Sequence, residues 1–180
     1  MKYFNTRNEL LTILNKNIKV CEIGVFKGEF SKVILDILNP SELHLIDLFD
    51  GQMCSGDKDG NNIIWTNLND EHESLCNKYK YNKNVFIHKG FSHTILPSFK
   101  NDYFDMVYID GDHSYDGVKL DLNISYNKIK KNGYIFGHDY IESRFEGVVR
   151  AVNEFCQEKK LNIEYLTKDG CPTFCIKKIE

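Results

Sequence analysis

The chain has 180 residues, of which 42% are hydrophobic and 27% are charged, the balance of a globular domain rather than of a disordered segment. Its net charge of −3 lacks the basic excess of nucleic-acid-binding domains, and no apolar stretch approaches the roughly 20 residues that cross a bilayer. Residues 1–7 lack the apolar core of a signal peptide, so we expect a cytoplasmic protein with a single domain over residues 1–180 that binds neither nucleic acid nor a membrane.

The first large elements are a strand and a helix joined by a glycine turn. Residues 18–23 are apolar, the turn contains Gly24 and Gly28, and apolar residues then recur at helical spacing as far as Leu38. Glycine lets a ligand approach the backbone closely, and the N-terminus of the following helix offers free N–H groups. We therefore expect a small ligand with an anionic or polar tail to bind over residues 22–30.

Two further segments stand apart from the regular pattern. Thr6 and Glu9 form a capping-box pattern ahead of several leucines, which predicts an N-terminal helix within residues 1–16. Residues 50–66 are polar and rich in glycine, aspartate and asparagine. A loop of this length in a compact domain is usually functional or mobile, so we interpret it either as a substrate lid or as a solvated insertion.

Strands and helices alternate along the rest of the chain. Further strands are predicted over 43–49, 84–88, 103–110 and 134–137, helices over 67–80, 115–130 and 147–160, and a final pair of strands over 163–166 and 173–179. Alternation of this kind favours parallel strands with right-handed crossovers. The predicted fold is α/β, with a Rossmann-like, doubly wound, seven-stranded sheet that is mostly parallel and ends in a C-terminal antiparallel hairpin.

Polar residues follow each predicted strand of the parallel part: Glu22 and Gly24, then Asp47, Gly90 and Ser92, Asp110, Asp112 and His113, and His138 and Asp139. The carboxyl ends of parallel strands meet at one edge, where such folds bind ligands. An acidic residue about 20 positions after the glycine turn, here Asp47, accepts hydrogen bonds from ribose hydroxyls in Rossmann-like units. Phe26 stands between the two glycines and argues against a dinucleotide pyrophosphate. Asp116 and Asp121, in contrast, are interpreted as surface charges on the helix.

These residues also resemble a known family. The run Glu22-Ile-Gly-Val-Phe-Lys-Gly28, together with Asp47, resembles motif I and the acidic second-strand end of class I S-adenosylmethionine-dependent methyltransferases, and the aromatic between the glycines is similar to catechol O-methyltransferases. The run Ile109-Asp-Gly-Asp-His-Ser-Tyr-Asp-Gly-Val118 and the later Gly137-His-Asp-Tyr140 resemble the small methyltransferase domains found with macrolide and aminocoumarin sugar O-methyltransferases. The resemblance covers roughly residues 18–156.

The resemblance implies S-adenosylmethionine as the cofactor and a divalent metal ion, Mg²⁺ or Mn²⁺, as a second one. It places the cofactor on Glu22, Gly24, Phe26, Gly28, Asp47, Leu48, Gly90, Phe91, Ser92 and Asp110. In metal-dependent members a carboxylate after the fourth strand and a pair after the fifth bind magnesium, and these positions are Asp110, His138 and Asp139 here. Imidazole is a poor magnesium ligand. Either a softer metal is used, or His138 is not a ligand and Asp112 supplies the missing oxygen.

Methyl transfer to oxygen needs a deprotonated nucleophile held in line with the methyl group. A divalent cation lowers the pKa of a bound hydroxyl, and an imidazole can take its proton near neutral pH. The predicted catalytic residues are Asp110, with His113 or His138 as the base. We expect O-methylation of a small hydroxylated molecule, such as a sugar or glycoside, by a protein for which a homodimer is a reasonable expectation. The alternatives are a metal-dependent hydrolase that uses the Asp/His cluster and a non-catalytic module for an adenosine ligand.

Overall fold

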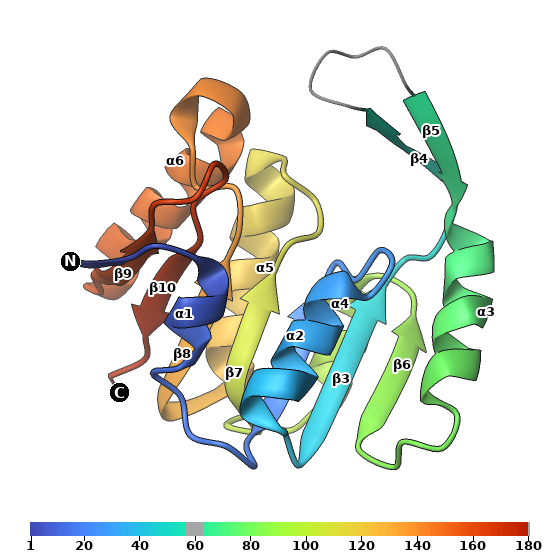
Figure 1. Cartoon of the computed structure of the whole chain (residues 1–180). Coiled ribbons are helices and arrows are strands. Elements are labelled where there is room, and N and C mark those ends of the chain that lie inside the picture. The colour runs from blue at the N-terminus through green and yellow to red at the C-terminus, as the bar shows by residue number, and fades with distance from the viewer. Residues whose placement is uncertain (57–62, 180) are drawn as a thin grey trace.

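A computed structural model of the chain describes residues 1–56 and 63–179, and the middle layer of this described part is an eight-stranded sheet (Figure 1). Its strands lie in the order β1 (Lys2–Phe4), β9 (Ile163–Thr167), β10 (Phe174–Lys177), β8 (Ile129–Gly137), β7 (Phe104–Ile109), β2 (Lys19–Ile23), β3 (Glu42–Asp47) and β6 (Val85–Lys89). Strand β10 runs antiparallel to β8 and β9, and the other neighbouring pairs are parallel. The predicted Rossmann-like fold with a C-terminal antiparallel hairpin is confirmed, and β1 adds an eighth strand beside β9.

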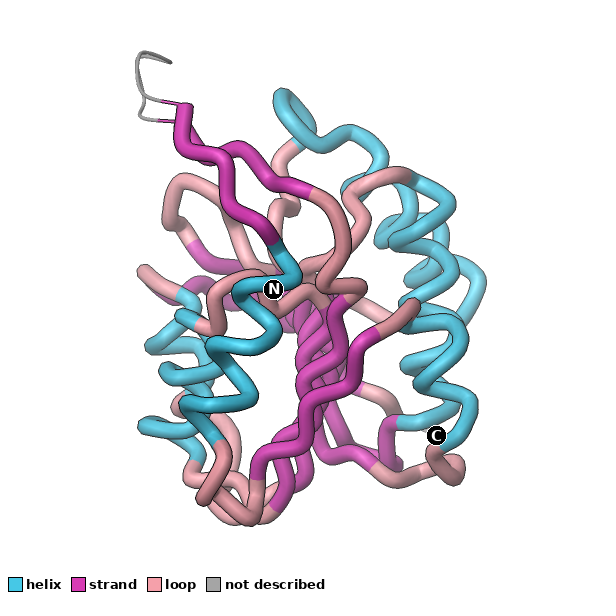
Figure 2. Tube along the Cα trace, turned by 90° about the vertical axis from the view of Figure 1, so that its right-hand side faces the viewer, coloured by secondary structure: helices cyan, strands magenta, loops and turns pink. Residues whose placement is uncertain are grey.

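Helices cover both faces of this sheet, as the turned view in Figure 2 shows. One face packs against α1 (Arg7–Leu11), α2 (Glu29–Leu38) and α3 (Leu68–Tyr79). The other packs against α4 (Ser92–Ile95), the 3₁₀ turn η1 (Leu96–Ser98), α5 (Tyr115–Lys128) and α6 (Glu142–Lys159). Each face has its own apolar cluster, so the strands between them are apolar on both sides.

Strand β2 shows how the alternation of side chains divides residues between the two faces. Cys21 and Ile23 belong to the apolar cluster beneath α5 and α6, whereas Val20 belongs to the cluster beneath α1 and α2. Successive side chains of a strand point to opposite faces. Glu22 therefore points to the α2 side, away from the strand end where the sequence analysis placed it.

The N-terminal segment differs from the helix predicted within residues 1–16. Its helix, α1, has only five residues, and it begins where the capping pattern predicted, because the Thr6 hydroxyl accepts a hydrogen bond of 3.2 Å from the Glu9 N–H. The residues before it form β1, whose backbone pairs in parallel with β9. Pairing along an open sheet edge satisfies backbone groups that a first helical turn would leave without partners.

The segment predicted as a long polar loop over residues 50–66 contains regular structure. Strands β4 (Gln52–Gly56) and β5 (Ile63–Asn67) pair in antiparallel fashion as a separate two-stranded sheet. Residues 57–62 lie outside the described residues. The hairpin continues directly into α3, whose first residue is Leu68. Its role as a lid stays a prediction.

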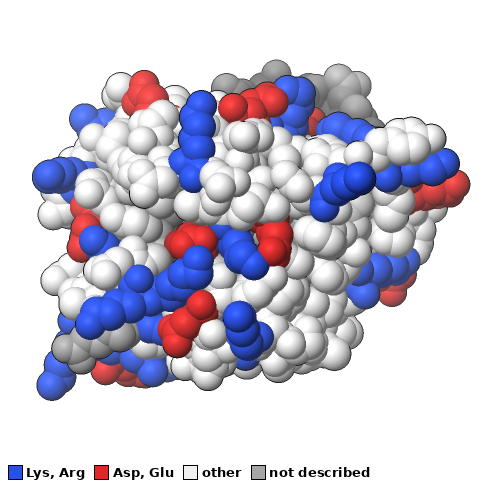
Figure 3. All heavy atoms as spheres, turned by 90° about the horizontal axis from the view of Figure 1, so that it is seen from below, with Lys and Arg blue, Asp and Glu red and all other residues white. Residues whose placement is uncertain are grey.

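The face at the amino ends of the parallel strands carries charges of both signs, as the view from below in Figure 3 shows. Lysines here pair with acidic residues, as in Lys19 with Glu42 at the start of β2 and β3, and Lys130 with Asp105. Among the described residues, no helix combines the length and apolar character that crossing a membrane would require. The polar groups that could carry chemistry lie at the opposite edge.

Candidate active site

A cavity of about 620 Å³ lies at the carboxyl ends of β2, β3, β6 and β7. Most of its wall is apolar, and its polar groups come from the strand ends and from the start of α5. Of the predicted cofactor-binding residues, the lining includes Gly24, Phe26, Asp47, Leu48, Gly90, Phe91, Ser92 and Asp110. Glu22 and Gly28 are not part of it. The structure therefore brings together eight of the ten residues, from four separate strand ends.

The glycine turn takes a backbone path that larger residues would not allow. Gly24 has a φ of 82°, and a Cβ atom at this position would lie 2.0 Å from the carbonyl oxygen of Asp110. Gly28 has a φ of 68°, and a Cβ there would lie 2.5 Å from a methyl group of Leu75 on α3. Gly24 is thus required where two strand ends meet beneath the cavity, whereas Gly28 serves the packing of α2 against α3.

Asp47 holds the turn in place. Its Oδ2 accepts hydrogen bonds from the N–H groups of Val25 at 2.7 Å and Phe26 at 3.0 Å, and its Oδ1 accepts one from Phe49 at 2.8 Å. A carboxylate has about four acceptor sites, so Oδ1 retains room for a further donor. Because Asp47 also lines the cavity, it can bind a ligand hydroxyl while it fixes the backbone beneath that ligand.

Glu22 is buried beneath the site rather than exposed in it. Its side chain is 1% exposed and accepts a hydrogen bond of 2.5 Å from the Ser31 hydroxyl on α2. Burial raises the pKa of Glu22 to about 8, with the negative charge of Asp110 adding to the shift and the Ser31 hydroxyl opposing it. Its position follows from the alternation along β2, which turns it toward the helix.

Asp121 was predicted to be a surface charge on the helix, and this prediction is wrong. Asp121 is only 4% exposed, lines the cavity, and accepts a hydrogen bond of 2.5 Å from the Ser92 hydroxyl. Burial raises its pKa to about 6, although the hydrogen bond from Ser92 opposes the shift. A signal was available, because Asp121 falls in helical register with Val118 and Leu122 on the buried face of α5.

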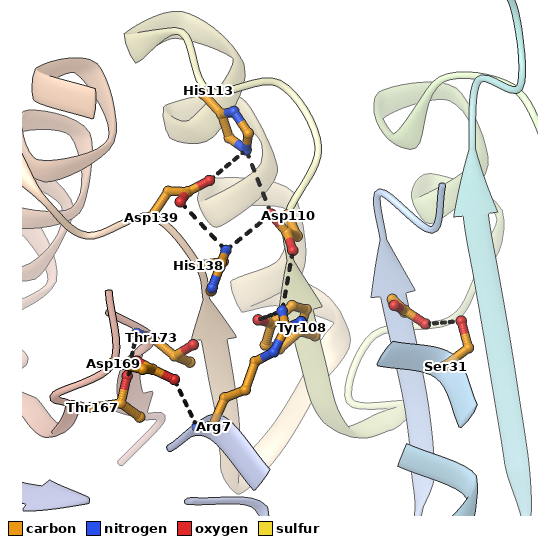
Figure 4. Close-up of polar contacts among 11 residues, drawn as sticks. Arg7, Ser31, Tyr108, Asp110, His113, His138, Asp139, Thr167, Asp169 and Thr173 are labelled. Carbon is orange, nitrogen blue, oxygen red and sulfur yellow. Dashed lines mark hydrogen bonds and ion pairs between the residues drawn. The ribbon is translucent and has the colours of Figure 1, made fainter. Parts of the chain in front are cut away.

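A second group of polar side chains lies beside the cavity, where β7 and β8 end (Figure 4). The Nε2 atom of His113 is 3.5 Å from Asp110 Oδ1 and 3.2 Å from Asp139 Oδ2. The Nδ1 atom of His138 is 3.6 Å from Asp110 Oδ1 and 3.4 Å from Asp139 Oδ1. The structure therefore gathers four of the five residues that the sequence analysis singled out after these two strands, all but Asp112, into one cluster of two carboxylates and two imidazoles.

Charge coupling within this cluster shifts the pKa values of its members. Burial lowers the pKa of His138, but the two carboxylates outweigh this effect and raise it to about 9. The contact with Asp110, joined by the charge of Asp139, also raises the pKa of His113. Burial of Asp139 acts against its charged form, yet the contacts with His138 hold its pKa below the usual value. Positive imidazole charge therefore balances the two carboxylates.

The arrangement also contains a candidate metal site. Among the described residues, Asp110, His113 and Asp139 are the group whose donor atoms all lie within 4.8 Å of one another. His113 Nε2 is buried without a hydrogen-bond partner, because neither carboxylate contact has hydrogen-bond geometry. The predicted set had His138 in place of His113. Asp112, the predicted substitute, instead accepts hydrogen bonds from the N–H and hydroxyl of Ser114 at the start of α5.

Two residues that the sequence analysis did not single out complete the site. The Arg7 guanidinium on α1 lies 3.7 Å from Asp110 Oδ2 and donates a hydrogen bond of 3.2 Å to the hydroxyl of Tyr108 (Figure 4). It also lies 4.3 Å from the centre of the Phe30 ring. The N-terminal helix thus places a cation against the carboxylate that the cavity and the cluster share. A lone arginine in a polar N-terminal segment carries no signal of such a contact.

Comparison with known proteins identifies a family. A family model described as a methyltransferase domain matches residues 21–140, a span that contains the glycine turn, Asp47 and the Asp–His cluster. An uncharacterized protein of Acanthamoeba polyphaga mimivirus is 27% identical over 157 residues, which cover 84% of this chain and 66% of that protein. The chain therefore spans slightly less than two thirds of the length of this relative.

Solved structures of methyltransferases share the fold. The O-methyltransferase NovP has a TM-score of 0.67 at 18% identity, over 97% of this chain and 80% of that chain. The N-methyltransferase NodS from Bradyrhizobium japonicum, in complex with S-adenosyl-L-homocysteine, has a TM-score of 0.64 at 12% identity, over 97% of this chain and 86% of that chain. At such identities the likeness concerns the fold, and the two proteins differ in the atom that they methylate.

Proposed function

This chain belongs to the family of S-adenosylmethionine-dependent methyltransferase domains, and we propose that it methylates an oxygen atom of a small hydroxylated acceptor, such as a sugar or glycoside, with the assistance of a divalent cation. The observation that carries the proposal is the double position of Asp110. This residue belongs both to the lining of the cavity and to the cluster of carboxylates and imidazoles. It joins the place for the cofactor to the place where an acceptor oxygen would be held.

The cavity suits the cofactor in size and in the order of its polar groups. Its volume of about 620 Å³ falls in the range of cofactor sites. We place the methionine end over the turn at Gly24, the ribose on the free acceptor site of Asp47, and the base between Leu48 and Phe91. In this pose the sulfonium lies nearest to Asp110, because the carbonyl group of Asp110 packs directly against Gly24.

The donor set of the cluster fits a divalent cation. Asp110, His113 and Asp139 would hold it, and the buried imidazole nitrogen without a hydrogen-bond partner is the feature that supports this assignment. A mixed set of carboxylate oxygens and imidazole nitrogen suits Mn²⁺ or Zn²⁺ better than Mg²⁺. When bound, such a cation lowers the pKa of a hydroxyl that it coordinates.

The chain's own residues would position the acceptor and move its proton. His113 is assigned to the cation, which leaves His138 as the candidate general base beside Asp110. Without a bound cation, Asp110 and Asp139 raise the pKa of His138, and sharing their charge with a cation would leave the ring neutral enough to accept a proton. The net charge of −3 and the mixed charges of the lower face support a small-molecule acceptor rather than a nucleic acid (Figure 3).

Two measurements test this proposal separately. Calorimetric titration with S-adenosylhomocysteine after treatment with a chelator should show micromolar binding without metal, because the cavity does not need the cluster to bind the cofactor. Methyl transfer to a panel of sugars, glycosides and catechols should then depend on added Mn²⁺. Failure to bind S-adenosylhomocysteine would refute the cofactor placement, and transfer that is insensitive to the chelator would refute the role of the cation.

Substitution of the nitrogen ligand sharpens the metal test. His113→Gln should weaken Mn²⁺ binding about tenfold or more, because removal of a first ligand leaves only two carboxylates to hold the ion. His72→Gln on α3, outside the cluster, is the matched control and should leave Mn²⁺ binding unchanged. Equal Mn²⁺ affinities of His113→Gln and the wild-type protein would show that His113 is not a ligand.

A further inference from the structure

The guanidinium of Arg7 has more hydrogen-bond donors than its neighbours use. Among the residues that the structure describes, its side chain donates one hydrogen bond, from Nη1 to the hydroxyl of Tyr108, and its ion pair with Asp110 spans 3.7 Å, which is too long for a hydrogen bond. A guanidinium carries five N–H donors. The side chain is 31% exposed, and none of its nitrogens is among the buried atoms that lack a partner. A ligand can therefore reach the remaining donors.

Contacts with three other elements fix the position of Arg7 beside the cluster. Its guanidinium carbon lies 4.3 Å from the centre of the Phe30 ring on α2, and Nη1 bonds Tyr108 on β7. The backbone N–H of Arg7 donates a hydrogen bond of 3.2 Å to Oδ2 of Asp169, in the turn between β9 and β10, and the Thr167 hydroxyl bonds the other oxygen of that carboxylate (Figure 4). A cation held in this way loses little freedom when it binds a ligand.

The basic side chains at this place outnumber the carboxylates. Arg7, His113 and His138 face Asp110 and Asp139, and Asp110 is in contact with all three of them. Arg7 contacts Oδ2 of Asp110, whereas the two imidazoles contact Oδ1. Because an arginine is always charged and this one shares its carboxylate with two other groups, a ligand with one negative charge would improve the charge balance on the α1 side of Asp110.

We infer that Arg7 selects an acceptor that carries a carboxylate near the hydroxyl to be methylated, such as a uronic acid or a hydroxybenzoate. This inference rests on the proposed function, in which the acceptor oxygen is held at the cluster beside Asp110. The carboxylate of the acceptor then lies on the α1 side of Asp110 and the hydroxyl on the side of the imidazoles. The planar fork of a guanidinium matches the two oxygens of a carboxylate, which a neutral acceptor does not supply.

The test compares acceptors that differ in this one group. Values of kcat/KM are measured for two pairs, 3,4-dihydroxybenzoate with catechol and methyl glucuronide with methyl glucoside, using the wild-type protein, Arg7→Met and Arg150→Met. In at least one pair the wild-type protein should prefer the carboxylate by about tenfold or more. In Arg7→Met this preference should fall to within about threefold, because methionine has no N–H donor. Arg150, exposed on α6, is the matched control and should keep the wild-type ratio.

The ratio separates recognition of a carboxylate from an effect of Arg7 on Asp110 alone. Loss of a partner of Asp110 would slow both members of a pair equally, so an unchanged ratio in Arg7→Met overturns the inference even if both rates fall. A wild-type protein without preference for the carboxylate in either pair overturns it as well, whether or not the variant folds, and leaves the proposed function intact. Transfer to none of the four acceptors would instead contradict the proposed function, and the inference with it.

Discussion

The cavity and the Asp–His cluster differ in the partners that they give to their carboxylates. In the cavity, Asp47 and Asp121 accept hydrogen bonds from neutral groups, namely backbone N–H groups and a serine hydroxyl. In the cluster, Asp110 and Asp139 face an arginine and two histidines. Carboxylates with neutral partners keep acceptor sites for the hydroxyl and amino groups of a ligand that does not change its charge. Carboxylates among cations suit a place where charge is gained and lost during the reaction.

The largest expected effect comes from removing the charge of Asp110, which lines the cavity and also belongs to the cluster. Asp110→Asn should lower the rate of methyl transfer by about 100-fold or more, because the cation and both imidazoles lose a charged partner. The affinity for S-adenosylhomocysteine should change by less than about threefold, since Asn keeps the shape of the cavity wall. Radiolabel transfer and calorimetry on the same preparation check both values. A parallel loss of rate and affinity would assign Asp110 to the cofactor alone.

The corresponding substitution in the cavity, that of Asp47, should affect the affinity for the cofactor rather than the rate. Asp47→Asn removes the charge that strengthens the hydrogen bonds from Val25 and Phe26, and it can leave one donor without an acceptor. We expect the affinity for S-adenosylhomocysteine to fall about tenfold to 100-fold, with less than a threefold loss of rate at saturating cofactor. Asp50→Asn, three residues further along the chain, serves as the control. An unaltered affinity would show that Asp47 does not hold the cofactor.

The contact between α1 and Asp110 should have a smaller effect on the rate. Arg7→Met keeps most of the packing against Phe30 but removes the cation that lies beside Asp110. We expect kcat to fall about tenfold while KM for the cofactor stays within twofold, because a positioning residue acts through the carboxylate rather than on the cofactor. Arg7→Lys should recover part of the rate, and Arg150→Met on the exposed side of α6 should change neither value. A rise in KM alone would place Arg7 at the cofactor.

The prediction from sequence succeeded for residues whose position depends only on the order and direction of the strands. Asp47 and Asp110 follow buried apolar runs, and parallel strands bring such positions to one edge whatever the details of packing. The same reasoning could not find Arg7, because its contact with Asp110 depends on how a five-residue helix docks onto α2. Nor could it find β1, a three-residue strand that pairs only because β9 leaves an open edge.

Side-chain direction limited the rest of the prediction. His113 and His138 both follow strands, and only the rotation of the rings shows that His113 converges with the two carboxylates while His138 contacts them from another side. The prediction for Asp121 failed for a related reason. Acidic residues on helices are usually exposed, but Asp121 shares the buried face of α5 with Val118 and Leu122. Such positions need the packed structure.

Glu22 lines neither the cavity nor the cluster, so it should have the smallest effect on methyl transfer, and it tests instead whether a buried carboxylate with a neutral partner costs stability. Burial raises its pKa to about 8 in the folded protein, against 4.5 as the ordinary value. Between these values the unfolded chain releases the proton while the folded chain keeps it, so the stability that depends on Glu22 falls as the pH rises from about 4.5 to about 8.

Glu22→Gln removes this dependence and retains a donor or acceptor for Ser31. Its free energy of unfolding relative to the wild-type protein should therefore rise by about 4 kcal/mol between pH 4 and pH 8, whereas Glu29→Gln, exposed on α2, should show no such change in urea unfolding. A constant difference between Glu22→Gln and the wild-type protein across this range would mean that Glu22 is ionised in the folded state, as a buried charge beneath the cavity.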